Sequence, residues 1–542
     1  MSSSAGRTSL FPIAPTDPYA FAAGSQQRAD LASALDDIRN ADFVVASNID
    51  GHEVHTSKRV DIVAPHNHKE VLGQVHYAGA KEAQSAVDAS VSNAQWWGRL
   101  PWEERVAPFL RAADMLEHGP WRARLNAATM IELSKTSYQA DIDAACETVD
   151  FIRANVKNMV DMYDVQPGSN PGAWNRLEYR PLEGFVFAVT PFNFTCMNNL
   201  AFAPAILGNT VVWKPAESAS LVAHLSMQLL REAGLPEGVI NVVYGEGPDI
   251  GPTVLDSPHL GAVHFTGSTT TFQHLWRSVG ENIAQYRNYP RVVGETGGKD
   301  FIVAHPSADV EALAVACIRG TYEYQGQKCS AASRLYVPRS LWPELRERLV
   351  AMTEQVKVGD PTDPSVYVGA VINGRQHAKH VEALAQARKE NLVVVGGNTD
   401  DSVGWFVDPT VLEVDDPRST FITNELFAPV LTTFVYEDNE WEDVLKLVDS
   451  TTTYGLTGAV FAQDRTAVAQ AADALRYTAG NFYVNDKPTG SVVGHQPFGG
   501  ARASGTNDKA GTVWNLIRFA SPRTTKENHL RVTDFGYPHL DL

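Results

Sequence analysis

The chain has 542 residues, 44% of them hydrophobic and 20% charged, which is enough for one large core or for two to three domains. The formal net charge of −18 argues against nucleic acid and anionic membranes as partners, and RNA binding fits poorly with it. The four cysteines form no CxxC pair and no Cys/His cluster of ligand spacing, which argues against a disulfide scaffold and a metal site and predicts a reducing, cytoplasmic location.

The amino-terminal region is predicted to be an arm, not a leader. The first 25 residues lack the apolar core of a signal peptide and contain a single arginine, Arg7. Residues 1–60 are rich in Ser, Ala and Pro at their start, and we expect them to wrap onto the first domain. The most apolar long window, 185–206, contains two prolines and three asparagines, which makes it a poor membrane span.

Helical patterns dominate from residue 81 to residue 162. The Ala-rich stretch 81–135 is predicted to be helical. Tyr138 to Met162 is predicted to be one long helix because its apolar residues recur at steps of three and four. From Asn175 the pattern alternates and then becomes an apolar strand, so its alternating half predicts an extended hairpin arm.

Strands and helices then alternate, which predicts the α/β class. Short β-branched strands end in turns that lead to helical stretches, an order typical of parallel sheets with ligands at the carboxyl ends of the strands. A second series of the same kind follows Phe301. We therefore expect two parallel-sheet domains and an arm that pairs with another subunit. The expected ranges are 61–167 with 185–304 for the first domain, 305–514 for the second, and 168–184 with 515–542 for the arm.

Cys329 lies in "YQGQKCSAASRLYV", and two interpretations of it stay open. A buried structural thiol is the commonest fate of a free cysteine. Lys328 beside it favours the thiolate, however, and Gly326 and Ser330 let backbone N–H groups approach a developing oxyanion. The local sequence alone does not separate a core thiol from a nucleophile.

Two further polar residues follow predicted strands. Glu295 in "VVGETGGKDF" precedes two glycines, where it is either a general base or a solvated residue of a turn. Asn193 in "TPFNFT" is either an oxyanion donor or the cap of a helix amino terminus.

Two strand-to-helix turns have the chemistry of nucleotide sites. In "WKPAES", Lys214 and Glu217 fit ribose hydroxyls, and the glutamate disfavours a 2′-phosphate. In "FTGST", Gly267 and Ser268 open a helix where a pyrophosphate can bind. Each is also compatible with an ordinary turn. "YGEGPDIG" has the spacing GxGxxxG and is interrupted by Pro248, so it is a weak match to a dinucleotide fingerprint.

Taken in order, seven motifs resemble those of the aldehyde dehydrogenase superfamily. They span about residues 60 to 520 and read "TPFNFT", "WKPAES", "FTGST", "GETGGKD", "GQKCSA", "ELFAPV" and "PFGGARASG". Finer segments, including "YEYQGQKCSAASRLYVP", "NDKPTGSVVGHQPFGGARASGTNDKAG" and "SPRTTKENH", are similar to a monofunctional branch that oxidises L-glutamate γ-semialdehyde to L-glutamate in proline catabolism. Phe272 stands where many members have glycine.

The resemblance implies a cysteine mechanism with NAD as the cofactor. Cys329 would attack the aldehyde, Asn193 and the Cys329 N–H would hold the oxyanion of the thiohemiacetal, and Glu295 would activate water to hydrolyse the thioester. The first domain would be Rossmann-like and bind NAD. The implied cofactor residues are Thr190, Phe192, Lys214, Glu217, Gly267, Ser268, Glu425 and Phe427. The family's "FGP" is "FAP" here, with Ala428 in the turn.

For the substrate, the resemblance implies an anchor for an amino acid. Its α-carboxylate would bind Ser330 and the backbone N–H groups of Gly490 and Ser491, and Phe194 and Phe498 would sandwich the stem. Glu147 would lie near the substrate ammonium, unless it is a solvated residue of a helix face. Lys328 is a candidate partner of Glu147.

Rival functions remain from the same class and from others. They are oxidation of another semialdehyde such as succinate semialdehyde, hydrolysis by a cofactor-free thiol enzyme, and a non-catalytic oligomer. The expected partners are a small-molecule substrate, further copies of the chain in a dimer or a multiple of dimers, and a separate proline dehydrogenase.

Overall fold

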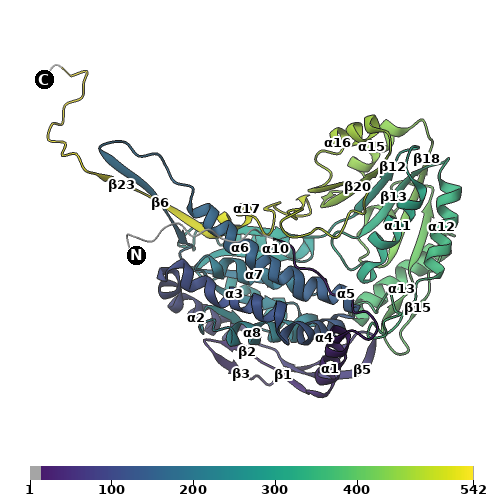
Figure 1. The fold of residues 1–542 in the computed structure, drawn as a ribbon, viewed down its shortest axis with the longest axis horizontal. Coiled ribbons are helices and arrows are strands. Elements are labelled where there is room, and N and C mark those ends of the chain that lie inside the picture. Colours follow the sequence, from purple (N-terminus) through teal and green to yellow (C-terminus); the bar gives the residue numbers. More distant parts are fainter. Residues whose placement is uncertain (1–13, 541–542) are drawn as a thin grey trace.

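The computed structural model describes residues 14–540. Two α/β lobes lie side by side, and a two-stranded ribbon extends away from them with the carboxyl terminus at its far end (Figure 1). The first lobe is drawn in purple to teal and the second in green (Figure 1). The predicted α/β class with two largely parallel sheets is confirmed.

The first lobe is built on a seven-stranded sheet. Five of its strands are parallel neighbours, and two short antiparallel strands complete one edge. The order is β11 (Arg291–Glu295), β10 (Leu260–Thr266), β7 (Phe185–Thr190), β8 (Thr210–Pro215), β9 (Ile240–Val242), β2 (Ser47–Ile49) and β3 (His52–Val54). Strand β8 is buried along its whole length, as expected for a parallel strand covered on both faces.

Helices cover this sheet and extend the lobe. They are α1 (Gln26–Asn40), α2 (Ala80–Arg99), α3 (Trp102–His118), α4 (Trp121–Leu133), α7 (Asn199–Ile206), α8 (Ser220–Glu232), α9 (Gly247–Leu255) and α10 (Thr269–Glu281). A separate three-stranded sheet contains β1 (Phe43–Val45), β5 (Asn67–His76) and β4 (Arg59–Ala64). Of the expected amino-terminal arm, residues 1–13 lie outside the described residues, whereas α1 joins the core of the lobe and β2 and β3 extend its sheet.

The second lobe has its own seven-stranded sheet. Its order is β14 (Val393–Val395), β17 (Thr410–Val414), β18 (Val430–Tyr436), β13 (Ala332–Pro338), β12 (Asp300–Ala304), β20 (Thr457–Phe461) and β21 (Asn481–Val484), with only the β14–β17 pair antiparallel. Alternate residues of β12 enter two different cores, one with α11 (Val310–Tyr322) and α12 (Trp342–Glu354), the other with α15 (Trp441–Ser450) and α16 (Arg465–Ala474). The sheet is therefore covered on both faces.

Smaller elements connect the larger ones within this lobe and its edges. They are β15 (Thr399–Asp400) with β16 (Phe406–Val407), β19 (Tyr454–Gly455) with β22 (Ala501–Arg502), and the helices α13 (Gly374–Lys389) and α14 (Thr420–Thr423). Helix α17 (Val513–Leu516) instead packs on the first lobe, where Leu516 joins the core.

The helix expected over 138–162 is interrupted by a change of helix type. Helix α5 (Ser137–Ala140) passes into a π-helix over Asp141–Glu147, which continues as α6 (Thr148–Tyr163). A π-helix adds a residue to the turn and is frequent at functional sites. From Cys146 to Met159 the apolar stripe predicted from the sequence is buried, whereas Ile142 at its start is partly exposed. Asp141 and Asp143 of the π-turn are buried as well, and Glu147 at its end is partly exposed.

The arm is one antiparallel ribbon of two strands from distant parts of the chain. Strand β6 (Ala173–Pro181) pairs with β23 (Ala520–Asn528) along its whole length, from Ala520 opposite Pro181 to Asn528 opposite Ala173. Within the described residues, no helix is both long enough and apolar enough to pass through a membrane.

Candidate active site

Cys329 follows a tight turn that contacts of both lobes hold in place. Tyr324, Gln325 and Gly326 all have positive φ, at 52°, 55° and 66°. A Cβ on Gly326 would lie 2.1 Å from the Ala428 carbonyl oxygen, so this position requires glycine. The Gln325 amide donates to the carbonyls of Ser134 and Ala370 at 2.9 and 2.8 Å. Backbone strain of this kind persists only where the surroundings enforce it, which is typical of functional turns.

The Cys329 thiol differs from the other three cysteines. It is partly exposed, whereas Cys146, Cys196 and Cys317 are buried. Burial of its side chain, followed by the charge of Asp300, raises its pKa above the ordinary value. The resting group is therefore a thiol, which would have to lose its proton before it could act as a nucleophile.

Asn193 contacts the same turn from the first lobe. It follows β7, and its Nδ2 donates to the Gln327 carbonyl at 3.0 Å. The amino-terminal cap of the short helix that follows, Thr195–Asn198, is Phe194. Asn193 is therefore not the helix cap that its sequence also allowed, and its buried amide lies beside the turn that precedes Cys329.

Glu295 ends β11 and is enclosed by glycines. Its Oε2 accepts from the Gly500 N–H at 2.8 Å, and a Cβ on Gly499 would lie 3.1 Å from its Oε1. Burial raises its pKa well above the ordinary value. A solvated glutamate in a turn is thus excluded, and the side chain has the environment of a strong carboxylate base.

The residues expected to bind the cofactor gather at the carboxyl ends of β7, β8 and β10. Lys214 Nζ contacts Glu217 Oε1 at 2.9 Å, and the Glu217 side chain is 43% exposed. The Trp213 indole donates to Thr190 Oγ1 at 3.0 Å. Ser268 caps the amino terminus of α10, accepting from the Thr271 N–H at 3.1 Å. Gly267 lies against Phe265, whose ring would be 2.7 Å from a Cβ on that glycine.

Glu425 and Phe427 approach this region from the second lobe. Glu425 Oε1 accepts from the Gly298 N–H at 2.9 Å, and burial raises its pKa to about 6. Phe427 has a φ of 62°, and its ring lies edge-on to that of Phe192 with 6.0 Å between centroids. Two residues assigned to one cofactor thus meet although 235 positions separate them in the sequence (427 minus 192).

Polar side chains lie around Ser330, the residue that follows Cys329. Ser330 Oγ and Thr489 Oγ1 are 2.8 Å apart. Gly490 has a φ of 83°, and a Cβ on it would lie 2.9 Å from Lys487 Nζ. The hydroxyl groups of Ser330 and Thr489 and the ammonium group of Lys487 therefore lie close to the loop that contains Gly490 and Ser491. These donors match the needs of a carboxylate.

Glu147, the residue expected near the substrate ammonium, accepts a hydrogen bond from the Cys196 thiol at 3.0 Å. Burial raises the Glu147 pKa to about 7, so it is not a solvated residue of a helix face. Lys328, proposed as its partner, instead forms its ion pair with Glu323. The Phe194 ring has the ammonium groups of Lys135 and Lys328 at 4.4 and 6.0 Å from its centroid.

Phe498 is half-buried, and its backbone pairs with that of Ala510. It directly precedes Gly499 and Gly500, the glycines that enclose Glu295. The residue expected to flank the substrate stem is thus placed on the same loop as the partners of the expected base.

A family model described as the aldehyde dehydrogenase family matches residues 53–525. The chain belongs to the aldehyde dehydrogenase family. It is 45% identical over 537 residues to human mitochondrial delta-1-pyrroline-5-carboxylate dehydrogenase, covering 98% of this chain and 95% of that protein. The crystal structure of the delta-pyrroline-5-carboxylate dehydrogenase from Mycobacterium tuberculosis has a TM-score of 0.95 at 49% identity and 99% coverage of both chains. Its form bound with NAD has a TM-score of 0.94, covering 98% of this chain and 99% of that one.

Sequence reasoning missed several residues of this aldehyde dehydrogenase. Thr489 and Lys487 lie in the segment "NDKPTGS", where a lysine and a hydroxyl next to the predicted Gly490 were an available signal. Lys135 and Asp143 form a buried ion pair at 2.6 Å, which no local pattern indicates.

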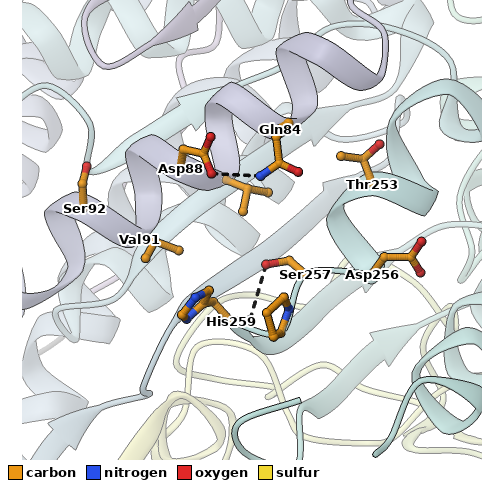
Figure 2. A pocket seen from close by; sticks show the side chains of 10 residues that line it. Gln84, Asp88, Val91, Ser92, Thr253, Asp256, Ser257 and His259 are labelled. Carbon is orange, nitrogen blue, oxygen red and sulfur yellow. Dashed lines mark hydrogen bonds between the residues drawn. The ribbon is translucent and has the colours of Figure 1, made fainter. Parts of the chain in front are cut away.

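The aldehyde dehydrogenase also has a surface pocket of about 560 Å³, which is lined by other residues than those of the candidate active site. Figure 2 shows it between α2 and the turn from α9 to β10, lined by residues such as Asp88, Asp256 and His259. None of its lining residues belongs to the expected catalytic, cofactor or substrate set. The site is therefore defined by its side chains and not by this cavity.

Proposed function

We propose that this aldehyde dehydrogenase uses NAD to oxidise L-glutamate γ-semialdehyde, the open form of Δ1-pyrroline-5-carboxylate, to L-glutamate in proline catabolism. One observation carries the substrate assignment. Ser330, the neighbour of Cys329, is joined to Thr489 at 2.8 Å, and Lys487 lies beside the adjacent Gly490. A carboxylate bound there would place the other end of a short amino acid near the thiol. The names of the similar proteins support the same substrate.

The residues at the strand ends fit a dinucleotide. Lys214 and the exposed carboxylate of Glu217 suit ribose hydroxyls, and the cap of α10 at Ser268 suits a pyrophosphate. Glu425 and Phe427 would hold the nicotinamide half from the second lobe. When bound, NAD supplies the acceptor for the hydride that leaves the substrate carbon. Glu217 favours NAD over NADP because a 2′-phosphate would meet its negative charge.

The chain's own groups perform the remaining steps. The Cys329 sulfur, after loss of its proton, bonds to the aldehyde carbon, and the carbonyl oxygen takes up the negative charge. The Asn193 amide and the Cys329 N–H donate to that oxygen. After oxidation the acyl group is held as a thioester, and Glu295 removes a proton from the water that hydrolyses it. Its raised pKa makes the Glu295 carboxylate a stronger base than an exposed one.

Glu147 would bind the substrate ammonium, and Phe194 and Phe498 would contact the methylene stem. This arrangement favours an amino-acid semialdehyde over succinate semialdehyde, which lacks the ammonium group. A cofactor-free thiol hydrolase would have no use for the paired Lys214 and Glu217 or for Phe427.

A homodimer, or a multiple of dimers, fits the arm. Trp174 is 60% exposed on β6, which belongs to the ribbon that projects from the body (Figure 1), and Phe535 is 86% exposed in the tail that follows β23. Large apolar side chains on a projecting ribbon are suited to a second copy of the chain. A separate proline dehydrogenase would supply the substrate. The four free cysteines are consistent with a cytoplasmic location.

A steady-state assay of NADH formation tests the function. Δ1-pyrroline-5-carboxylate is expected to give a kcat/KM at least about 100-fold above that of succinate semialdehyde, because a site built for buried polar groups rejects analogues that leave them unpaired. Equal kcat/KM values for the two would overturn the substrate assignment, and NADH formation from neither would overturn the reaction.

A further inference from the structure

We propose that Lys135 and Asp143 form a buried positioning pair that holds the oxyanion donor Asn193 against the turn that carries Cys329. The inference rests on the roles proposed above for Asn193 and Cys329. Neither member of the pair touches the reacting atoms, so both are positioning residues.

Asp143 holds the segment that follows Asn193. Its Oδ2 accepts from the Thr195 N–H at 2.9 Å, and its Oδ1 accepts from the Cys196 N–H at 3.0 Å. The carboxylate thus binds both N–H groups at the start of the short helix Thr195–Asn198, whose cap, Phe194, has no side-chain acceptor to offer them. An ionised acceptor makes such hydrogen bonds short and directional.

Lys135 completes the unit and links it to the nucleophile turn. Its Nζ donates to Asp143 Oδ2 at 2.6 Å, and both side chains are 2% exposed. The same ammonium lies 4.4 Å from the ring centroid of Phe194 and 4.4 Å from that of Tyr324. One cation therefore contacts the residue after Asn193 and the first strained residue of the turn before Cys329.

The two held segments meet at the hydrogen bond that the proposal concerns. The Gln327 N–H donates to the Tyr324 carbonyl at 2.9 Å, which closes the turn. The Gln327 carbonyl in turn accepts from Asn193 Nδ2 at 3.0 Å. The adjoining Ser134 fixes the same turn, because its carbonyl accepts from the Gln325 amide at 2.9 Å. A shift of Phe194 or Tyr324 would therefore move the amide relative to the sulfur.

A metal ion is not needed to explain the acidic cluster. One ligand atom each from Asp143, Glu147 and Cys196 lies within 4.8 Å of the others. The Lys135 ammonium already supplies the positive charge, and the Cys196 thiol is occupied as a donor to Glu147.

The test uses a substitution that removes one contact of Asp143 and leaves both buried charges in place. Thr195→Pro deletes the N–H that donates to Asp143. Proline is tolerated there because Thr195 opens the short helix and Phe194 has an extended backbone, with φ −141° and ψ 121°. Thr195→Val is the matched control, since it removes only the hydroxyl that contacts Thr129 at 3.0 Å. Asp143→Asn and Lys135→Arg complete the set, the latter retaining the charge.

The readout is the release of nitrophenolate from 4-nitrophenyl acetate, in which the Cys329 sulfur takes the acetyl group and water later removes it. This reaction needs the thiol and the oxyanion donors but neither NAD nor an amino-acid anchor. It can therefore be followed even if the proposed substrate proves wrong. We expect Asn193→Ala to lower kcat about 100-fold and Thr195→Pro to lower it about 10-fold. Thr195→Val and Lys135→Arg should retain most of the rate, with the Kd for NAD unchanged throughout.

The double variant Asn193→Ala with Thr195→Pro decides between positioning and general support of the fold. If Asp143 acts through Asn193, the double variant should match Asn193→Ala alone, because the second change has nothing left to misplace. Losses that multiply to about 1,000-fold, or a Thr195→Pro enzyme as active as wild type, would overturn the proposal. If Thr195→Pro does not fold, Asp143→Asn takes its place in the same double-variant comparison, with the same two outcomes. If neither variant folds, Lys135→Met decides, because full esterase activity without the Lys135 charge would also overturn the proposal.

Discussion

Cys329 combines partial exposure with a position at the end of a strained turn, and the other three cysteines have neither property. Burial and nearby carboxylates raise the pKa of Cys329. In the proposed mechanism its reactivity would therefore come from a base and from oxyanion donors instead of from a resting thiolate. Lys328 does not change this, because its charge is used by Glu323.

Replacing Cys329 by alanine should abolish NADH formation and leave NAD binding intact, because the residue supplies the bond to the substrate and no contact to the nucleotide. Turnover and NAD titration should be measured on the same preparation. Cys317→Ala is the control, since this thiol lies in the core of the second lobe and should be dispensable for turnover. Activity in the Cys329 variant would contradict its role as nucleophile.

Glu295→Gln should slow hydrolysis of the thioester more than its formation. The amide keeps the acceptor for the Gly500 N–H but cannot take a proton from water. Because burial raises the pKa of Glu295, the carboxylate form is lost as the pH falls, and deacylation should speed up with rising pH in the wild type but not in the variant. Single-turnover mass spectrometry should show the acyl-enzyme, and its absence would exclude Glu295 as the base.

Glu147 gives a second pH dependence, in KM. Its pKa of about 7 means that the carboxylate is present above this pH and lost below it. KM for the amino-acid semialdehyde should therefore rise as the pH falls below about 7, and KM for succinate semialdehyde, which has no ammonium group, should not. Glu147→Gln should flatten the first profile at a high KM. A wild-type KM that does not change with pH would remove Glu147 from substrate binding.

Whether a site residue can be predicted from the sequence depends on the helix, strand or turn that carries it. Asn193 follows an apolar strand, and Lys214 and Glu295 lie at the carboxyl ends of two others, so their place at a sheet edge was predictable from local sequence. The alternative interpretations of these residues were excluded only by contacts in the folded chain, such as that of Asn193 with Gln327, which is 134 positions away in the sequence. The π-turn over Asp141–Glu147 was not predictable, because one extra residue leaves the spacing of three and four intact on either side. Lys135 was missed for a different reason, because its partners Asp143 and Phe194 contact it only in the folded chain.

The turn before Cys329 is the element whose geometry is most restricted. Gly326→Ala places a Cβ 2.1 Å from the Ala428 carbonyl oxygen and at a φ of 66°, which costs about 1–2 kcal/mol in backbone strain before the clash is counted. We expect a lower Tm and loss of turnover. Gly280→Ala in α10 is the matched control, because nothing lies within 4 Å of its Cβ, and it should stabilise the protein by up to about 1 kcal/mol. Equal effects of the two substitutions would contradict the packing described for the turn.

At the scale of the whole molecule, the candidate site is built from residues of both lobes that contact one another. Glu425 of the second lobe accepts from the Gly298 N–H, and Phe427 contacts Phe192 of the first lobe. Asn193 of the first lobe in turn contacts the Cys329 turn of the second. The ribbon of β6 and β23 belongs to neither core and joins residues that are more than 300 positions apart in the sequence. Its nine-residue register pairs only β6 with β23, which supports the proposal made above that the arm contacts a second subunit.

Disrupting the apolar tail should therefore separate the subunits without unfolding them. Val532, Phe535 and Tyr537 are 76%, 86% and 69% exposed, and replacing all three by serine removes apolar surface that a second copy would cover. Sedimentation equilibrium should show a shift toward monomer, with the Tm of the lobes little changed. Arg176→Gln is the control on the same ribbon, since its ion pair with Glu527 is about half exposed and contributes little. An unchanged mass for the triple variant would show that the tail does not hold the oligomer together.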